Sequence, residues 1–303
     1  MKTIYIITSS SNIIDEININ SEIKEQIKKA EIFFSEINIK IIYWNLFLKS
    51  YLWYSWSIEE RINEIHNGFL DKNIDFILSS QWWYNSNELL KYLNFDLIKE
   101  NYKPIIWLSD ITILLNAIYK KTLKITYHGY DYIWQIWKSA VSHFSSNQLN
   151  NFLNKWKLEN KIEWILLNNY KKAKWILIGW CLPSYSLILW TEYDPLELNK
   201  DFIFFIEDIW EPWERIFSYI EQLLINKKFI KNCKWFIIWN FSFCNFENKK
   251  EYNIEKLIKD RLDFLNIPIL KINNIWHIVE NSILPIWKEV EILDNNLYLN
   301  NVK

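Results

Sequence analysis

The chain contains very little glycine: it carries 3 glycines and 19 tryptophans in 303 residues. Average glycine usage of about 7% would give roughly 21 glycines at this length, which is close to the two counts taken together. Adjacent tryptophans such as Trp82-Trp83 fall where the backbone is expected to turn tightly. Glycine supplies positive φ or close backbone approach at such sites, whereas an indole would strain them. We therefore hypothesise that most tryptophans stand for glycine, encoded by UGA codons that the source organism reads as glycine.

The alternative is a chain that uses tryptophan as its favourite core aromatic. Isoleucine, asparagine and lysine are abundant, as AT-rich coding would produce, and this fits the recoding hypothesis. Individual positions such as Trp156 and Trp213 stay open to a genuine tryptophan.

Cysteine and histidine are also scarce. The three cysteines, Cys181, Cys233 and Cys244, form no C-x-x-C pair and cannot all be joined in disulfides, so we expect reduced, mostly buried thiols. No two of the four histidines share a metal-ligand spacing. We therefore expect neither a metal site nor a cofactor.

Long apolar runs and a bias in charge are missing as well. No run approaches the roughly 18 residues of a membrane span, and the N-terminus lacks the apolar core of a signal peptide, so we expect a cytoplasmic protein with no membrane partner. The 35 basic and 36 acidic residues give a net charge of −1 and are dispersed along the chain. Nothing here predicts a nucleic-acid partner.

The first 130 residues alternate short apolar runs with amphipathic stretches, which predicts βαβ units and a parallel sheet. Strands are expected at residues 3–9, 39–43, 75–79, 104–107 and 123–127, and helices at 21–36, 57–70 and 110–119. Ser57 and Glu60 form an S-x-x-E capping box at the start of the second of these helices. Residues 129–173 are polar and rich in asparagine, and read as an extended connection with helix-like stretches.

The second half predicts a smaller mixed α/β domain. Apolar runs suggest strands at 175–178, 202–206, 236–238 and 267–270, and helices are expected at 212–225 and 254–264. We therefore divide the chain into an N-terminal α/β domain at 1–150, a connection at 151–173 and a C-terminal domain at 174–303.

Ser109 stands at a predicted junction of strand and helix. A serine there projects its hydroxyl above the carboxyl edge of a parallel sheet, beside free backbone amides at a helix N-terminus. That placement suits a nucleophile, and it equally suits a helix N-cap. A glycine at position 107 would tighten the turn and give a substrate more room.

A second turn follows the strand predicted at 75–79. With glycines restored at Trp82 and Trp83, residues 79–87 read S-S-Q-G-G-Y-N-S-N. Two glycines at the carboxyl end of a strand bring bare N–H groups to a ligand, as an oxyanion hole requires. A loop that binds nothing is the alternative.

Two further residues complete a candidate constellation. Glu207 follows the apolar run at 202–206, and His277 lies between two apolar runs. Each also has a purely structural interpretation: Glu207 could cap a helix or lie in solvent, and His277 could be a structural histidine. Ser109, Glu207 and His277 nevertheless occur in the order nucleophile, acid, base, which is a known order for a hydrolytic triad. Ile111 occupies the last position of the G-x-S-x-G motif, which disfavours the ordinary α/β-hydrolases.

The motifs at these positions resemble those of the serine LD-carboxypeptidase family, which includes murein tetrapeptide carboxypeptidases and microcin C self-immunity peptidases. The resemblance spans nearly the whole chain, and at its anchors this chain has tryptophan where the family has glycine. The anchors are residues 82–90 (G-G-Y then a small-residue and Asn stretch in the family), 104–112 (P-K-x-x-x-G-Y-S-D-I-T), 126–129, 178–182 with 190–191, 206–211, 238–239 and 275–287.

The resemblance implies a role for each matched residue. Ser109 would be the nucleophile, His277 its general base and Glu207 the residue that orients the imidazole. The oxyanion hole would use backbone amides of Asp110 and of the Trp82-Trp83 pair. Substrate contacts would come from three residues of the following loop, Tyr84, Asn85 and Asn87.

The resemblance also implies a Rossmann-like N-terminal domain and a swivelling C-terminal domain, commonly in a homodimer and without metal. Three departures, Leu108 for an aromatic, Cys181 for asparagine and Tyr130 for proline, bear on substrate preference. The first hypothesis is a serine peptidase that trims the terminal D-alanine from murein tetrapeptides during peptidoglycan recycling. The second is an amidase for aminoacyl-nucleotide antibiotics such as microcin C, since residues 85–87 look closer to the immunity-type branch. The third is a catalytically silent protein that binds peptidoglycan fragments.

Overall fold

A computed structural model describes most of the chain, namely residues 1–44, 47–52, 54–81, 85–136, 143–158, 162–163, 165–166, 173–244, 253–272, 282–293 and 296–298. The chain forms two compact units. Unit 1 comprises Met1–Glu159, Trp276–Pro285 and Asn301–Lys303, and unit 2 comprises Asn160–Ile275 and Ile286–Asn300.

Unit 1 is built on a six-stranded sheet in the order β12-β5-β4-β3-β1-β2. The pairs β1–β2, β1–β3, β3–β4 and β4–β5 are all parallel. The strands are β1 (Lys2–Ile7), β2 (Ile39–Tyr43), β3 (Phe76–Ser79), β4 (Ile105–Trp107), β5 (Thr126–His128) and β12 (Leu284–Ile286). Parallel strands align their carboxyl ends at one edge, which is where ligands bind in open α/β sheets.

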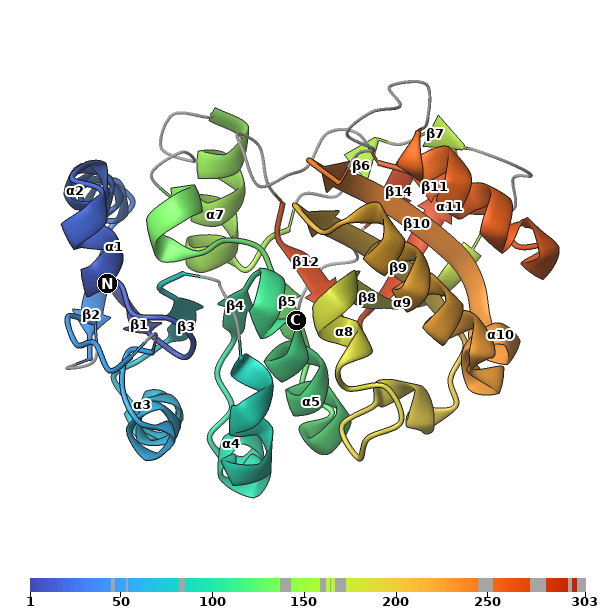
Figure 1. Ribbon diagram of the computed structural model, residues 1–303. Helices are drawn as coiled ribbons and strands as arrows, with labels where there is room; N and C mark the ends of the chain where they lie inside the picture. The colour runs from blue at the N-terminus through green and yellow to red at the C-terminus, as the bar shows by residue number, and fades with distance from the viewer. Residues whose placement is uncertain are drawn as a thin grey trace. The chain divides into compact units, whose positions relative to one another are not determined.

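Helices cover both faces of this sheet. Helices α2 (Glu22–Glu36) and α7 (His143–Lys155) lie on one face, and α3 (Ile58–Leu70), α4 (Phe95–Glu100) and α5 (Thr112–Thr122) lie on the other (Figure 1). Shorter helical segments connect them: α1 (Ile14–Ile19), η1 (Ser86–Tyr92), η2 (Ser109–Ile111) and the π-helix η3 (Tyr132–Ile136). The result is a three-layer α/β unit.

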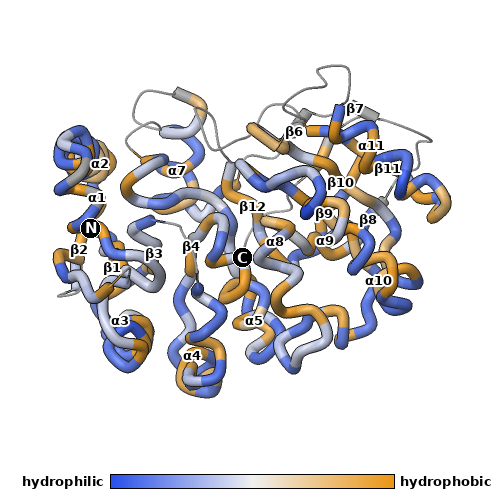
Figure 2. Tube along the Cα trace, viewed as in Figure 1, coloured by the Kyte–Doolittle hydropathy of each residue, from blue (hydrophilic) through white to orange (hydrophobic). Residues whose placement is uncertain are grey.

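Local sequence explains why these helices form where they do. The hydroxyl of Ser57 accepts a hydrogen bond from the Glu60 N–H and caps the start of α3. Helix α5 ends where Leu123 adopts a left-handed conformation with φ of 60°. Figure 2 shows hydrophobic and hydrophilic residues alternating along the helices of unit 1, as amphipathic helices on a sheet require.

Unit 2 contains a mixed eight-stranded sheet in the order β6-β14-β13-β8-β9-β10-β11-β7. Its centre is parallel, with β9 paired to β8 and β10, and β10 paired to β11. The strands are β6 (Ile162–Glu163), β7 (Ile165–Leu166), β8 (Ala173–Cys181), β9 (Phe202–Ile209), β10 (Cys233–Ser242), β11 (Ile269–Lys271), β13 (Glu289–Leu293) and β14 (Asn296–Tyr298). Its helical segments are α8 (Leu182–Ser186), η4 (Pro195–Leu198), α9 (Trp213–Ile225), α10 (Lys227–Asn232), α11 (Ile254–Leu262) and η5 (Asp263–Leu265).

The predicted fold class is confirmed: a parallel-sheet α/β unit precedes a mixed α/β unit. The helix-like stretches expected within residues 129–173 include η3 and the 13-residue helix α7. Phe152 on α7 is fully buried and packs on Phe76 of β3, so tertiary packing stabilises a helix in an asparagine-rich sequence. None of the helices that the structure describes is long and apolar enough to span a membrane.

Several tryptophans occupy backbone conformations that favour glycine. The left-handed region holds Trp156, Trp190, Trp210 and Trp287, with φ between 53° and 70°. A left-handed conformation costs an L-residue about 1–2 kcal/mol through contact of Cβ with the backbone. Trp156, which the sequence leaves open to a genuine tryptophan, is one of the four. These conformations are what the glycine hypothesis predicts.

Candidate active site

Ser109 lies at the turn between β4 and the helical segment that leads into α5. Leu108 is extended, and Ser109 then adopts a left-handed conformation with φ of 57°. Such a conformation is uncommon outside glycine and concentrates at functional sites. The chain therefore turns sharply at this serine.

The Ser109 hydroxyl makes no hydrogen bond within the described residues, so it does not cap the helix. Leu108 and Ile111 hold the cap positions of η2 and α5, and neither side chain can accept a capping bond. The serine is 8% exposed and lies next to the N-terminus of the 11-residue helix α5, where the helix dipole is positive. This arrangement suits a nucleophile whose reaction develops negative charge.

Buried structure on both sides fixes the position of the turn. Strand β4 pairs with β3 through Ile105 and Ile106, and with β5 through Trp107 and His128. Nearly all of helix α5 is buried behind it. Ser109 therefore sits at the carboxyl edge of the sheet between rigid elements, which is how catalytic groups are held in place.

Asp110 links this turn to the segment that follows β3. Its Oδ2 atom accepts the backbone N–H of Ser86 at 2.9 Å and the hydroxyl of Ser86 at 2.6 Å. Burial raises the pKa of Asp110 to about 6, against the lowering effect of the two bonds from Ser86. The sequence pointed to the Asp110 backbone, and the structure adds a contact by its side chain.

Of the loop at 82–87, which is predicted to supply oxyanion and substrate contacts, the structure describes only residues 85–87. Trp82, Trp83 and Tyr84 lie outside the described residues. Asn85 and Asn87 are both exposed, and Asn85 is left-handed with φ of 73°. The Asn85 amide nitrogen donates to the Tyr54 hydroxyl at 3.0 Å.

Glu207 lies in unit 2, near the carboxyl end of the central strand β9. It is 3% exposed and pairs in register with Cys181 of β8. Burial raises the pKa of Glu207 well above its usual range, and the adjacent Asp208 raises it further. Burial likewise raises the pKa of the Cys181 thiol, followed by the charges of Asp208 and Glu207. His277 lies outside the described residues.

The structure thus places Ser109, Asp110 and the end of the 82–87 loop together at one edge of unit 1, and it describes Glu207 within unit 2. The described residues contain no group of three or more histidines, cysteines or carboxylates able to hold a metal ion. All three cysteines are buried, as expected.

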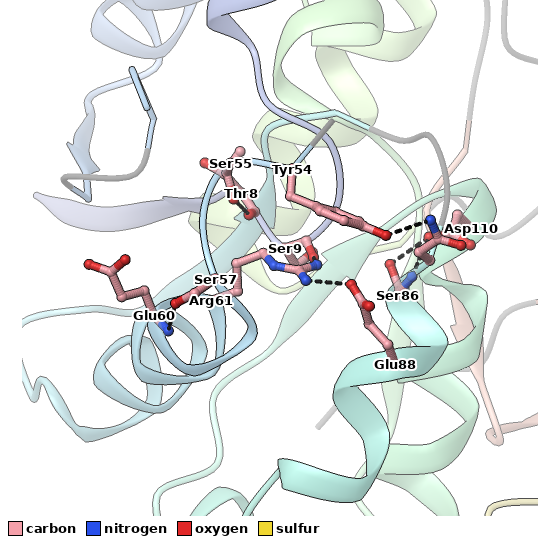
Figure 3. Close-up of polar contacts among 11 residues, drawn as sticks. Thr8, Ser9, Tyr54, Ser55, Ser57, Glu60, Arg61, Ser86, Glu88 and Asp110 are labelled. Atoms are coloured by element: carbon pink, nitrogen blue, oxygen red, sulfur yellow. Dashed lines mark hydrogen bonds and ion pairs between the residues drawn. The ribbon is translucent and has the colours of Figure 1, made fainter. Parts of the chain in front are cut away.

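An ion pair made by a buried arginine beside this edge was not predicted. Arg61 on α3 is 1% exposed and binds Glu88 of η1 (Figure 3). The two residues are 27 positions apart, and no local motif joins them. Only the S-x-x-E capping box at the start of α3 indicated that the Arg61 position lies in a first helical turn.

Together, these features define a two-unit α/β protein with a serine at a sharp turn between a strand and a helix. Comparison with known proteins identifies its family. The profile of the LD-carboxypeptidase N-terminal domain matches residues 4–129, and that of the C-terminal domain matches residues 176–292. The chain therefore belongs to the LD-carboxypeptidase family, peptidase S66, whose members are serine-type carboxypeptidases.

Individual relatives agree with this assignment. YocD of Bacillus subtilis (strain 168) is 29% identical over 254 residues, which cover 76% of each protein. A solved structure of MccF in complex with glutamyl sulfamoyl guanosine has a TM-score of 0.84 at 22% identity, covering 100% of this chain and 97% of that one. A muramoyltetrapeptide carboxypeptidase from Oxalobacter formigenes has a TM-score of 0.82 at 17% identity, covering 98% and 97%. At these identities the two structures show a shared fold.

Proposed function

We propose that the protein is a cytoplasmic serine LD-carboxypeptidase that removes the terminal D-alanine from murein tetrapeptides. The observation that carries this proposal is the left-handed turn at Ser109, whose hydroxyl caps no helix. Membership in the LD-carboxypeptidase family supplies the reaction class. As in other members, we expect a homodimer that acts on a small peptide without a metal or cofactor.

In the proposed reaction, the Ser109 oxygen attacks the carbonyl carbon between an L-centre and the terminal D-alanine, while His277 takes the hydroxyl proton. The backbone amides of Asp110 and of the Trp82-Trp83 pair stabilise the oxyanion. The C–N bond then breaks, and His277 returns its proton to the departing amine of D-alanine. A water molecule, deprotonated by the same histidine, then hydrolyses the ester, and His277 passes that proton to the departing Ser109 oxygen.

Glu207 would orient the His277 imidazole and stabilise its cation. A fully buried carboxylate is costly unless a cation lies beside it, and burial raises the pKa of Glu207 accordingly. An imidazolium formed during the reaction would offset that cost. An ionised Glu207 beside His277 would therefore favour the protonated imidazolium.

A second candidate is an amidase of the immunity type, which cleaves aminoacyl nucleotides. The Asn85-Ser86-Asn87 sequence favours it, because Asn85 and Asn87 are exposed beside the candidate nucleophile turn and offer amide groups to a polar ligand. MccF, which shares the fold, has been solved with glutamyl sulfamoyl guanosine.

The two candidates are separated by offering both substrates to two purified forms of the chain. One form keeps its tryptophans, and the other carries Trp82→Gly, Trp83→Gly, Trp107→Gly and Trp276→Gly. From the form with the four glycines we expect D-alanine release from a murein tetrapeptide, with little glutamate release from glutamyl sulfamoyl guanosine. The opposite preference would favour the immunity-type amidase. Binding of the tetrapeptide by a folded protein without any turnover would favour the silent binding protein.

A further inference from the structure

Hydrogen bonds and an ion pair join polar side chains near Asp110, at the carboxyl edge of unit 1 (Figure 3). Asp110 follows Ser109 directly in the sequence and is 5% exposed. One of its oxygens accepts both hydrogen-bond donors of Ser86, the N–H and the hydroxyl. The segment that begins at Ser86 is therefore fastened to the turn that presents the nucleophile.

We propose that the Asp110 side chain is a positioning residue, which holds the Ser109 turn against the segment that begins at Ser86. This inference rests on the proposed function, in which the Ser109 hydroxyl attacks the substrate and the Asp110 backbone amide stabilises the oxyanion. Both groups belong to the turn that the two bonds from Ser86 fasten. A turn held in this way keeps the nucleophile and the amide at fixed positions.

A second anchor holds the same segment from the opposite side. The Arg61 guanidinium donates to the backbone carbonyl of Ser9 at 3.1 Å and also binds Glu88, two residues after Ser86. Its centre lies 4.5 Å from the ring centroid of Tyr54, which covers it. Buried and paired in this way, Arg61 joins the segments after β1 and β3 to helix α3.

The Tyr54 hydroxyl completes the set by accepting the Asn85 amide at 3.0 Å. Three contacts, at Asn85, Ser86 and Glu88, thus hold residues 85–88. Each contact comes from a different element. Catalytic groups need this kind of support, because a displacement of about 1 Å can cost 100-fold in rate.

The test uses three variants of the full chain. Asp110→Ala removes the acceptor, whereas Asp110→Asn keeps an acceptor oxygen in the same place. Asp75→Ala is the matched control, because the Asp75 carboxylate accepts the Thr3 N–H at 2.7 Å at the start of β1 and β3, which is the opposite edge of the same sheet.

For Asp110→Ala we expect kcat for D-alanine release to fall about 100-fold with a small change in KM. Asp110→Asn should recover most of the rate that Asp110→Ala loses, because its amide oxygen can still accept from Ser86, and Asp75→Ala should keep the parent rate. Hydrogen exchange at the Ser86 amide should accelerate in Asp110→Ala alone. A folded Asp110→Ala variant with the parent kcat, or an Asp110→Asn variant as slow as Asp110→Ala, would overturn the inference.

A reagent that needs no natural substrate separates this inference from the proposed function. A fluorophosphonate modifies an activated serine, and its rate on Ser109 is measured in the same variants. If the parent releases no D-alanine but Ser109 reacts, and Asp110→Ala slows that reaction while Asp110→Asn does not, the positioning role stands and the substrate assignment fails. A parent in which Ser109 does not react would overturn both.

Discussion

Left-handed backbone occurs at three kinds of non-glycine residue that differ in their reason for adopting it. Asparagines such as Asn38 and Asn266 adopt it readily at turns. Ser109 adopts it at the sharp turn where we propose that the nucleophile lies. The tryptophans at 156, 190, 210 and 287 adopt it with no such reason, and a Cβ with a large indole is unfavourable there. Glycine would satisfy all four positions, and this favours the recoding hypothesis.

Trp190 gives the cleanest test of that reading. Its φ is 62° and it is 53% exposed, so glycine relieves backbone strain while little apolar burial is lost. We expect Trp190→Gly to raise the free energy of unfolding by about 1 kcal/mol, measured by urea denaturation.

The control for this substitution is Trp213→Gly. Trp213 begins helix α9 and its ring lies 5.7 Å from that of Phe217, so glycine there should lower the free energy of unfolding by about 1 kcal/mol. Destabilisation by both substitutions, together with UGG codons at the four left-handed positions, would refute the recoding hypothesis.

Helices and strands were predictable from the sequence where the spacing of apolar residues matches the side that the structure buries. Helix α3 and strand β2 have the bounds that were predicted to within a residue. Strand β12 was not predicted, because it has three residues and its partner β5 lies more than 150 positions earlier. The capping box at α3 is half formed: Ser57 caps the helix, while the Glu60 carboxylate lies 3.7 Å from Lys49. Such pairings depend on tertiary structure rather than on local pattern.

Helix α3 is tied to β1 by a buried acid whose titration can be followed. Glu64 accepts the Thr8 N–H at 2.8 Å, and burial raises its pKa from 4.5 to about 8. The folded protein therefore binds more protons than the unfolded chain between these two values. The contribution of Glu64 to stability is fully present below pH 4.5 and is lost as the pH rises through about 8.

We expect the unfolding free energy of the parent to fall, relative to that of Glu64→Gln, by up to about 1.4 kcal/mol per pH unit between pH 4.5 and 8. Denaturation curves at several pH values check this. Parallel stability curves for the two proteins across that range would mean that Glu64 is ionised in the folded state.

In the molecule as a whole, sequence motifs indicated the candidate site but not the side-chain contacts that hold its segments together. The position of Ser109 was predictable because an apolar strand and a predicted helix meet there. The contacts of Asp110 with Ser86 and of Arg61 with Glu88 were not, since they join segments 24 and 27 positions apart. The assignments of His277, Trp82, Trp83 and Tyr84 stay predictions, because these residues lie outside the described part of the chain.

The most direct measurement is D-alanine release from a murein tetrapeptide by the parent and by Ser109→Ala, with His128→Ala as a control for the identity of the base. We predict that Ser109→Ala folds like the parent while its turnover falls by several orders of magnitude, and that His128→Ala retains activity. Release by Ser109→Ala at close to the parent rate would contradict the assignment of Ser109 as the nucleophile.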